Sequence, residues 1–155
     1  MDLVWHWLTY AFLIALMVAA AMVIPRCQRV RPGDDYRDID NLDPTESISL
    51  DTTVRVHGYE RGDAVCYQLG EDEPLDRLFG WVAARPGDEV AIVGGTLIVN
   101  GEAATRGANL GMPAAGPIRV PADHLFIISD GHRYDSTAHG PIPGRALRGR
   151  VAELP

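Results

Sequence analysis

Serine, cysteine and histidine side chains supply the nucleophilic chemistry available to this chain, because it contains no lysine. All 14 basic residues are arginines, and a guanidinium stays protonated in proteins and so cannot act as a base. A serine or cysteine nucleophile would therefore need a histidine to accept its proton. The candidate nucleophiles are Ser47, Ser49, Ser136 and Cys66, and the candidate bases are His57, His132 and His139. Turn serines, a buried cysteine and solvent-facing histidines are the commoner roles of these residue types.

Acidic residues and histidines also raise the question of a metal site. Four of them fall on one expected loop near the C-terminal end: Asp130, His132, Asp135 and His139. Their spacing matches no standard ligand pattern. The acidic run at residues 34–46 does not show the twelve-residue ligand pattern of a calcium loop. We therefore predict no metal and no cofactor.

Short apolar runs separated by glycine, proline and aspartate predict that β-strands position these groups. Gly94-Gly95 joins two such runs, and glycines adopt the positive φ angles that a tight hairpin turn needs. Asn100-Gly101 predicts a second turn, and the segment 103–117 is expected to be an exposed loop or flap. The predicted strands are Thr53–Val56, Ala64–Leu69, Phe79–Ala84, Glu89–Val93, Thr96–Asn100, Ile118–Val120, His124–Ser129 and Leu147–Val151. The pattern predicts an all-β domain.

An uncharged N-terminal segment, residues 3–25, is long enough to cross a bilayer as a helix. Trp5, Trp7 and Tyr10 near one end are typical of a membrane interface. A cleaved signal peptide is the competing interpretation, but no basic region precedes the apolar run. We therefore predict a retained transmembrane helix.

The length of 155 residues leaves room for one further domain. We predict an acidic juxtamembrane linker over residues 26–52 and a β domain over residues 53–155. The formal net charge of -7 argues against a nucleic-acid partner, because affinity for phosphate backbones comes mainly from clustered positive charge. The two cysteines, Cys27 and Cys66, do not define a disulfide while their geometry is unknown.

The segment Phe79–Glu102, FGWVAARPGDEVAIVGGTLIVNGE, resembles the core block of the type I signal peptidase family. That block reads approximately Y-I-K-R-V-x-G-x-P-G-D-x-V and is followed by a hairpin that ends V-N-G-E. Three further blocks match in order: Asn41–Thr45, only at its Pro-Thr pair, then Arg61–Val65 and Ser129–Pro143. The Gly-Pro-Ile-Pro ending is closest to the branch that processes conjugative pilins. The resemblance implies a signal-peptidase-like coiled β-sheet domain with one N-terminal transmembrane helix.

The same resemblance implies that the catalytic positions are replaced. Type I signal peptidases use a serine nucleophile and a lysine base whose pKa is lowered by burial. Here Asn41 stands at the position of the nucleophile, Gly80 at that of the base and Ile39 at that of the oxyanion donor. Trp81 and Thr137 replace two arginines that brace the active-site aspartate in the family. We therefore predict a catalytically inactive protein, a pseudoenzyme, whose linker contains a degenerate nucleophile block.

A fold that has lost its catalytic groups can still bind the extended segment that its relatives hold along a strand edge. The predicted function is to bind or position a polypeptide, such as a pilin, a precursor or a membrane-complex subunit, during secretion, pilus or membrane-complex assembly. The residues expected to contact it are Trp81, Val82, Ala83, Ala84, Asp135 and Ser136. An ordinary core role for Trp81 is equally open. Two alternative functions remain: an active S26-type serine endopeptidase with a displaced nucleophile, and a purely structural single-pass subunit of a membrane complex.

Localisation follows from the resemblance and not from the charge pattern. Relatives of this kind place the domain outside the cytoplasm, which implies a bacterial inner-membrane protein with a periplasmic β domain. Arg26, Arg29 and Arg31 directly follow the apolar run, and the positive-inside rule alone argues for the opposite orientation.

Overall fold

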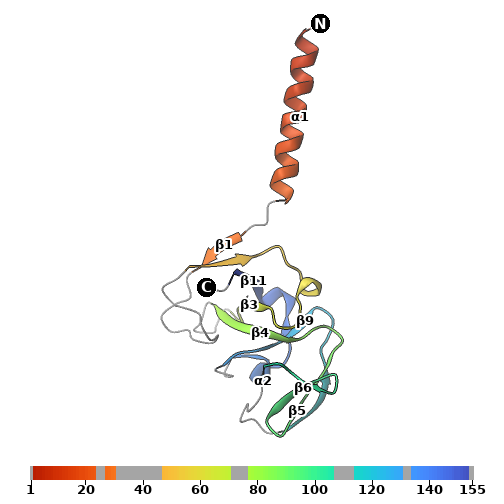
Figure 1. Cartoon of the computed structure of the whole chain (residues 1–155), viewed down its shortest axis with the longest axis vertical. Coiled ribbons are helices and arrows are strands. Elements are labelled where there is room, and N and C mark those ends of the chain that lie inside the picture. The colour runs from red at the N-terminus through yellow and green to blue at the C-terminus, as the bar shows by residue number, and fades with distance from the viewer. Residues whose placement is uncertain are drawn as a thin grey trace.

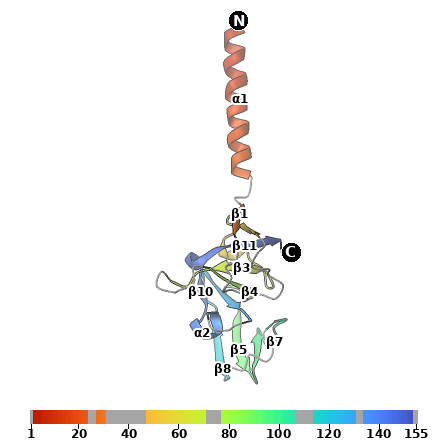
Figure 2. The same ribbon diagram turned by 90° about the vertical axis from the view of Figure 1, so that its left-hand side faces the viewer.

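The computed structural model describes residues 2–23, 27–30, 47–70, 77–106, 114–130 and 134–153. A long N-terminal helix extends away from a domain made of antiparallel strands (Figures 1 and 2). The helices are α1 (Asp2–Val23) and the short α2 (Ser136–His139), with 3-10 turns at Val56–Gly58 and Gly144–Ala146. The strands are β1 (Cys27–Val30), β2 (Ile48–Asp51), β3 (Ala64–Tyr67), β4 (Leu78–Ala84), β5 (Glu89–Val93), β6 (Thr96–Val99), β7 (Glu102–Ala103), β8 (Ala115–Arg119), β9 (His124–Ile128), β10 (Ile142–Pro143) and β11 (Leu147–Glu153). The predicted all-β character of the domain is confirmed.

The described strands form two sheets, and every pairing in them is antiparallel. The larger sheet has the order β1-β2-β11-β3-β4-β9-β10, and the smaller has the order β7-β6-β5-β8. The smaller sheet lies at the end of the domain that is farther from α1 (Figure 1). Strand β11 pairs with both β2 and β3, so the last described strand lies inside the larger sheet.

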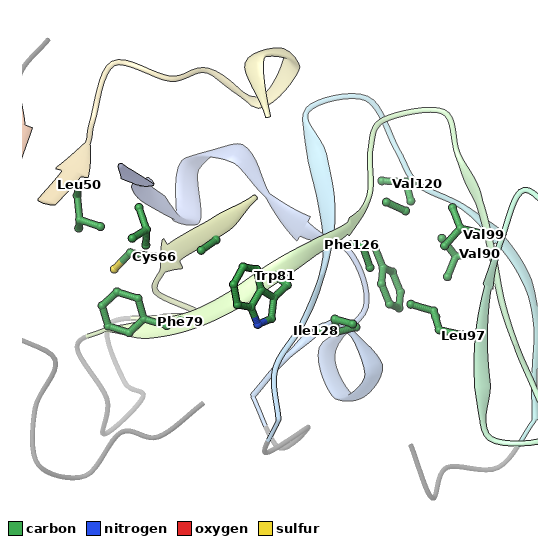
Figure 3. Close-up of a cluster of buried hydrophobic side chains, with 14 of the residues drawn as sticks. Leu50, Cys66, Phe79, Trp81, Val90, Leu97, Val99, Val120, Phe126 and Ile128 are labelled. Carbon is green, nitrogen blue, oxygen red and sulfur yellow. The ribbon is translucent and has the colours of Figure 1, made fainter. Parts of the chain in front are cut away.

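Strand β4 is the centre of the domain, and all of its residues are buried. Successive residues of a strand point to opposite faces, so β4 contributes to two separate hydrophobic clusters. One cluster contains Phe79 and Trp81 together with Val90, Leu97 and Val99 from the smaller sheet (Figure 3). The other contains Leu78 and Val82 together with Tyr59, Tyr67, Leu125 and Ile127. The smaller sheet therefore packs against one face of β4, and the opposite face packs against other parts of the larger sheet and its connections.

The two predicted turns are confirmed by the backbone. Gly94 and Gly95 have φ angles of 57° and 77° and connect β5 to β6. Asn100 and Gly101 have φ angles of 54° and 86° and lead from β6 to β7. Asparagine tolerates this left-handed conformation better than most residues, and here its side chain accepts a hydrogen bond from the Glu89 N–H at 2.8 Å.

Several strand boundaries differ from the predictions. The predicted strand Thr53–Val56 is wrong, because the backbone N–H and hydroxyl of Thr53 both donate to Asp51 Oδ1, at 2.9 and 2.6 Å. Such local side-chain bonds compete with strand pairing. The predicted linker, residues 26–52, contributes β1 and β2 to the larger sheet. Within the predicted loop 103–117, the residues from Ala115 onward pair with β5, and residues 107–113 lie outside the described part.

Helix α1 covers 22 residues, and the structure describes the side chains of residues 6–19. A search of the described residues finds no helix with the length and apolarity needed to cross a bilayer. The membrane span predicted for residues 3–25 is therefore not confirmed and stays a prediction.

Candidate functional site

Gly80, at the position that the resemblance assigns to the base, lies in the middle of β4 with no space beside it. It pairs with Val65 of β3, and β9 lies on its other side. A Cβ atom at position 80 would lie 2.6 Å from Ile127 Cγ2 and 2.8 Å from the Ile128 carbonyl oxygen. Ordinary contacts of this kind are 3.4 Å or longer. A lysine therefore does not fit at this position unless β9 shifts.

Asp135 and Ser136 hold the end of β9 against α2. The Ser129 N–H donates to Asp135 Oδ2 at 2.9 Å, and the Thr137 N–H donates to Oδ1 at 2.8 Å. The Thr137 hydroxyl also donates to Asp135 Oδ1. Ser136 Oγ accepts a hydrogen bond from the Ile127 N–H at 2.8 Å. Thr137 thus stabilises the buried aspartate with neutral groups, although the resemblance predicts an arginine there.

A pocket of about 350 Å³ lies beside Trp81. Its apolar wall combines β4 with the chain that runs from β6 through β7, and includes Trp81, Val82, Ala83, Val99, Ala103 and Ile128. Its polar lining includes Arg61, Glu102, Thr105 and Arg106. A mostly apolar wall with a few polar groups is typical of ligand sites, and this volume lies at the lower end of their range.

Trp81 forms the floor of this pocket and carries an unsatisfied polar atom. Its side chain stands out from β4 next to Ile128 (Figure 3), and the residue is 8% exposed. The indole Nε1 is buried, and among the described residues it has no hydrogen-bond partner. Most buried polar groups in proteins are paired, so this unpaired N–H is an exception. Trp81 is therefore both a core residue and a pocket residue.

Arg106 covers the indole ring of Trp81. Its Cζ atom lies 3.8 Å from the ring centroid, which is well within the range of a cation–π contact. Within the described part of the chain, Arg106 forms no ion pair. Arg106 lies in the segment that was predicted only as an exposed loop. Its contact with Trp81 depends on how the two sheets pack, so no local sequence signal reveals it.

Arg61 lines the pocket and forms an ion pair with Asp88. Arg61 Nη2 lies 2.8 Å from Asp88 Oδ1, and the Arg85 N–H donates to Asp88 Oδ2 at 2.7 Å. Asn100 Nδ2 donates to Asp88 Oδ1 at 2.9 Å. Burial acts to raise the pKa of Asp88, but these hydrogen bonds outweigh it and hold that pKa below its ordinary value. The positive charge of Arg61 is thus already balanced.

The remaining candidate groups are distributed over the domain. Cys27 is exposed and Cys66 is buried, and both are free thiols. Burial raises the pKa of the Cys66 thiol to about 12. Asn41, Ile39 and His132 lie outside the described residues. Where the structure is described, no group of three or more His, Cys, Asp or Glu side chains is arranged to hold a metal ion.

The structure brings together only some of the predicted contact residues. Trp81, Val82 and Ala83 line the pocket, whereas Ala84, Asp135 and Ser136 do not. The sequence reasoning missed the pocket roles of Glu102 and Arg106. Glu102 stands in the V-N-G-E ending of the hairpin, which was the signal closest to this role.

The turn before β3 and the turn after β4 lie beside one another, because Arg61 of the first forms an ion pair with Asp88 of the second at 2.8 Å. Over residues 4–154 the chain matches the family described as signal peptidase, peptidase S26. This match covers nearly the whole chain, so the protein belongs to the signal peptidase family, and the predicted family is confirmed. A search of curated proteins finds no match.

Proposed function

We propose that this member of the signal peptidase family binds a polypeptide and does not cleave it. The observation that carries the proposal is the enclosed glycine at position 80, where the family resemblance predicts a lysine. Glycine has no group that can take a proton from a nucleophile, and Ile127 Cγ2 occupies the space that such a group would need. The cations elsewhere in the chain are arginines, which cannot act as bases.

The candidate nucleophiles in the domain also favour binding over catalysis. Ser136 Oγ is buried and accepts a hydrogen bond from the Ile127 N–H. Cys66 is fully buried, and with a thiol pKa of about 12 it stays protonated at neutral pH. The thiolate is the reactive form of cysteine, so Cys66 is a poor nucleophile. With Ser136 buried as well, neither residue supports an active endopeptidase with a displaced nucleophile.

The pocket beside Trp81 is the binding site in this proposal. Strand β7 is the last described strand of the smaller sheet on that side, and an extended segment can add to an edge of this kind. Trp81, Val82 and Ala83 contact the bound segment from the opposite wall. The partner is a polypeptide such as a pilin, a precursor or a membrane-complex subunit.

We also propose that α1 anchors the protein in a bacterial inner membrane, with the β domain in the periplasm. Large apolar side chains of α1 are exposed, among them Trp7 at 70%, Phe12 at 68% and Met17 at 72%. Insertion into lipid removes such apolar surface from water. A reporter that is active only outside the cytoplasm is expected to be active when it is fused after Pro155, and a reporter that is active only in the cytoplasm is expected to be inactive there. Activity of a cytoplasmic reporter alone would reverse this orientation.

A precursor-cleavage assay tests the loss of catalysis. The purified full chain, in detergent micelles, is incubated with a polypeptide that has an Ala-x-Ala cleavage site. No turnover is expected, while an active signal peptidase serves as the positive control. Turnover that disappears when one serine or cysteine is replaced would overturn the proposal.

Site-directed crosslinking tests the binding role. A photoreactive residue placed at Thr105, in the pocket lining, is expected to capture a polypeptide in cells. The same residue placed at the exposed Arg119 of β8 is the control and is expected to capture much less. A stoichiometric, detergent-stable partner that is captured equally from both positions would instead indicate a purely structural subunit.

A further inference from the structure

Two residues that line the pocket carry hydrogen-bond donors with no partner among the described residues. One is the buried Nε1–H of Trp81, and an indole nitrogen can only donate. The other is the guanidinium of Arg106, which contacts the indole ring through Cζ at 3.8 Å. The five N–H donors of a guanidinium lie at the edge of its plane, so this contact leaves them available.

One cation beside the pocket is free to pair with an anionic ligand group. Three charged residues line it: Arg61, Glu102 and Arg106. Arg61 is neutralised by Asp88 at 2.8 Å, whereas Arg106 makes no ion pair with a described residue. Glu102 and Arg106 are both exposed, so water and salt screen both charges, and Arg106 attracts an anion while Glu102 opposes it. Arg106 is thus the cation that remains for a ligand.

The rest of the lining limits the size and type of that ligand. Val82, Ala83 and Ile128 provide apolar surface next to the two donors. A single planar anionic group on a small apolar body matches this combination, and a guanidinium pairs with a carboxylate through parallel hydrogen bonds.

We propose that the pocket recognises a carboxylate, which accepts hydrogen bonds from Arg106 and from Trp81 Nε1. This inference rests on the proposed function in taking a polypeptide as the ligand. The carboxylate then belongs either to the C-terminus of the polypeptide or to an acidic side chain. The exposed Arg106 offers its N–H groups from its place over the indole, whereas the buried Trp81 Nε1 becomes accessible only as the ligand enters.

The test uses three defined tripeptides and the full chain in detergent micelles. The first is N-acetylated Ala-Ala-Ala with a free C-terminal carboxylate, and the second is its C-terminal amide. The third is N-acetylated Ala-Asp-Ala amide, which has a carboxylate only on its side chain. Binding is measured by calorimetry and by the NMR signal of the Trp81 indole N–H, which is assigned by its absence in Trp81→Phe.

The free acid is expected to bind about tenfold or more tightly than the amide, as for a charge-assisted hydrogen bond. Arg106→Gln is expected to abolish this preference, and Arg119→Gln is the matched control that retains it. Arg106 is an exposed residue, so its substitution is not expected to disturb folding. Trp81→Phe keeps the aromatic ring and is expected to weaken binding of the acid by about three- to tenfold. If Ala-Asp-Ala amide binds more tightly than the free acid, the carboxylate source is a side chain; if the free acid binds more tightly, the source is the C-terminus, and equal affinities mean that the pocket accepts either.

Binding of the free acid and of Ala-Asp-Ala amide no tighter than that of Ala-Ala-Ala amide would overturn the carboxylate inference while leaving polypeptide binding intact. A preference that survives in Arg106→Gln would also overturn it. If no tripeptide shifts the Trp81 signal at millimolar concentration, the inference is wrong, and crosslinking from Thr105 then decides separately whether the proposed function stands.

Discussion

Replacing Gly80 with alanine tests whether the base position is closed by packing. The new Cβ would meet Ile127 Cγ2 at 2.6 Å and the Ile128 carbonyl oxygen at 2.8 Å, against ordinary contacts of 3.4 Å or more. The carbonyl belongs to the backbone of β9, which pairs with β4, so it cannot rotate away as a flexible side chain would. The strain must therefore be relieved by moving the strand.

The expected size of the effect follows from two opposing terms. Overpacking a well-packed core typically costs about 1–3 kcal/mol. Removing a glycine stabilises the folded state by about 0.4–1 kcal/mol through the unfolded chain. The net loss for Gly80→Ala is therefore about 1–2 kcal/mol, which lowers Tm by several degrees in a domain of this size.

Thermal unfolding of the full chain in detergent micelles, followed by circular dichroism, measures this loss. Gly116→Ala is the matched control, because a Cβ on Gly116 of β8 has nothing within 4 Å, and it is expected to leave Tm unchanged or slightly higher. A Tm for Gly80→Ala equal to that of Gly116→Ala would refute the reasoning. Position 80 would then have room for a side chain, and the main support for the proposed loss of catalysis would be gone.

Three further predictions concern residues around the site. The pKa of Asp88 is lowered in the folded state, so its ion pair contributes its full stability at pH values above the ordinary pKa of 3.8 and loses it as pH falls through the folded-state pKa. Asp88→Asn is expected to remove this component from a plot of unfolding midpoint against pH. An unchanged plot would contradict the prediction. Thr137→Val is expected to lower the free energy of unfolding by about 0.5–1.5 kcal/mol, because Asp135 loses a hydroxyl donor. Thr137→Ser keeps the hydroxyl and should unfold like the wild type. Equal losses of stability in both variants would argue against this hydrogen bond. Cys66 is expected to resist maleimide at neutral pH, because it is buried and its thiol pKa is about 12. The native protein should therefore label only at Cys27, and the urea-unfolded protein should label at both cysteines. Rapid labelling of two thiols in the native state would show that Cys66 is accessible.

The local turn chemistry of this protein could be predicted from sequence, but some strand boundaries could not. Gly94-Gly95 and Asn100-Gly101 form the predicted turns because the residues that set the backbone angles are the turn residues themselves. The strand predicted at Thr53–Val56 is wrong because two hydrogen bonds from Thr53 to Asp51 replace strand pairing. The sequence also did not reveal β1 and β2, which are strands through their pairing with each other and with β11.

The candidate site divides in the same way. The family and the absence of lysine are determined by residue identity, and no packing can supply an amine that the chain lacks. Tertiary structure alone decided that Ile127 closes the position of Gly80 and that Arg106 lies over Trp81, whereas the hydrogen bonds from Thr137 to Asp135 are a local helix cap between residues two apart. The contact at Gly80 is set by how β4 pairs with β9. The contact of Arg106 with Trp81 is set by how the smaller sheet packs against β4. Residues far apart in the sequence carry no local signal of that packing.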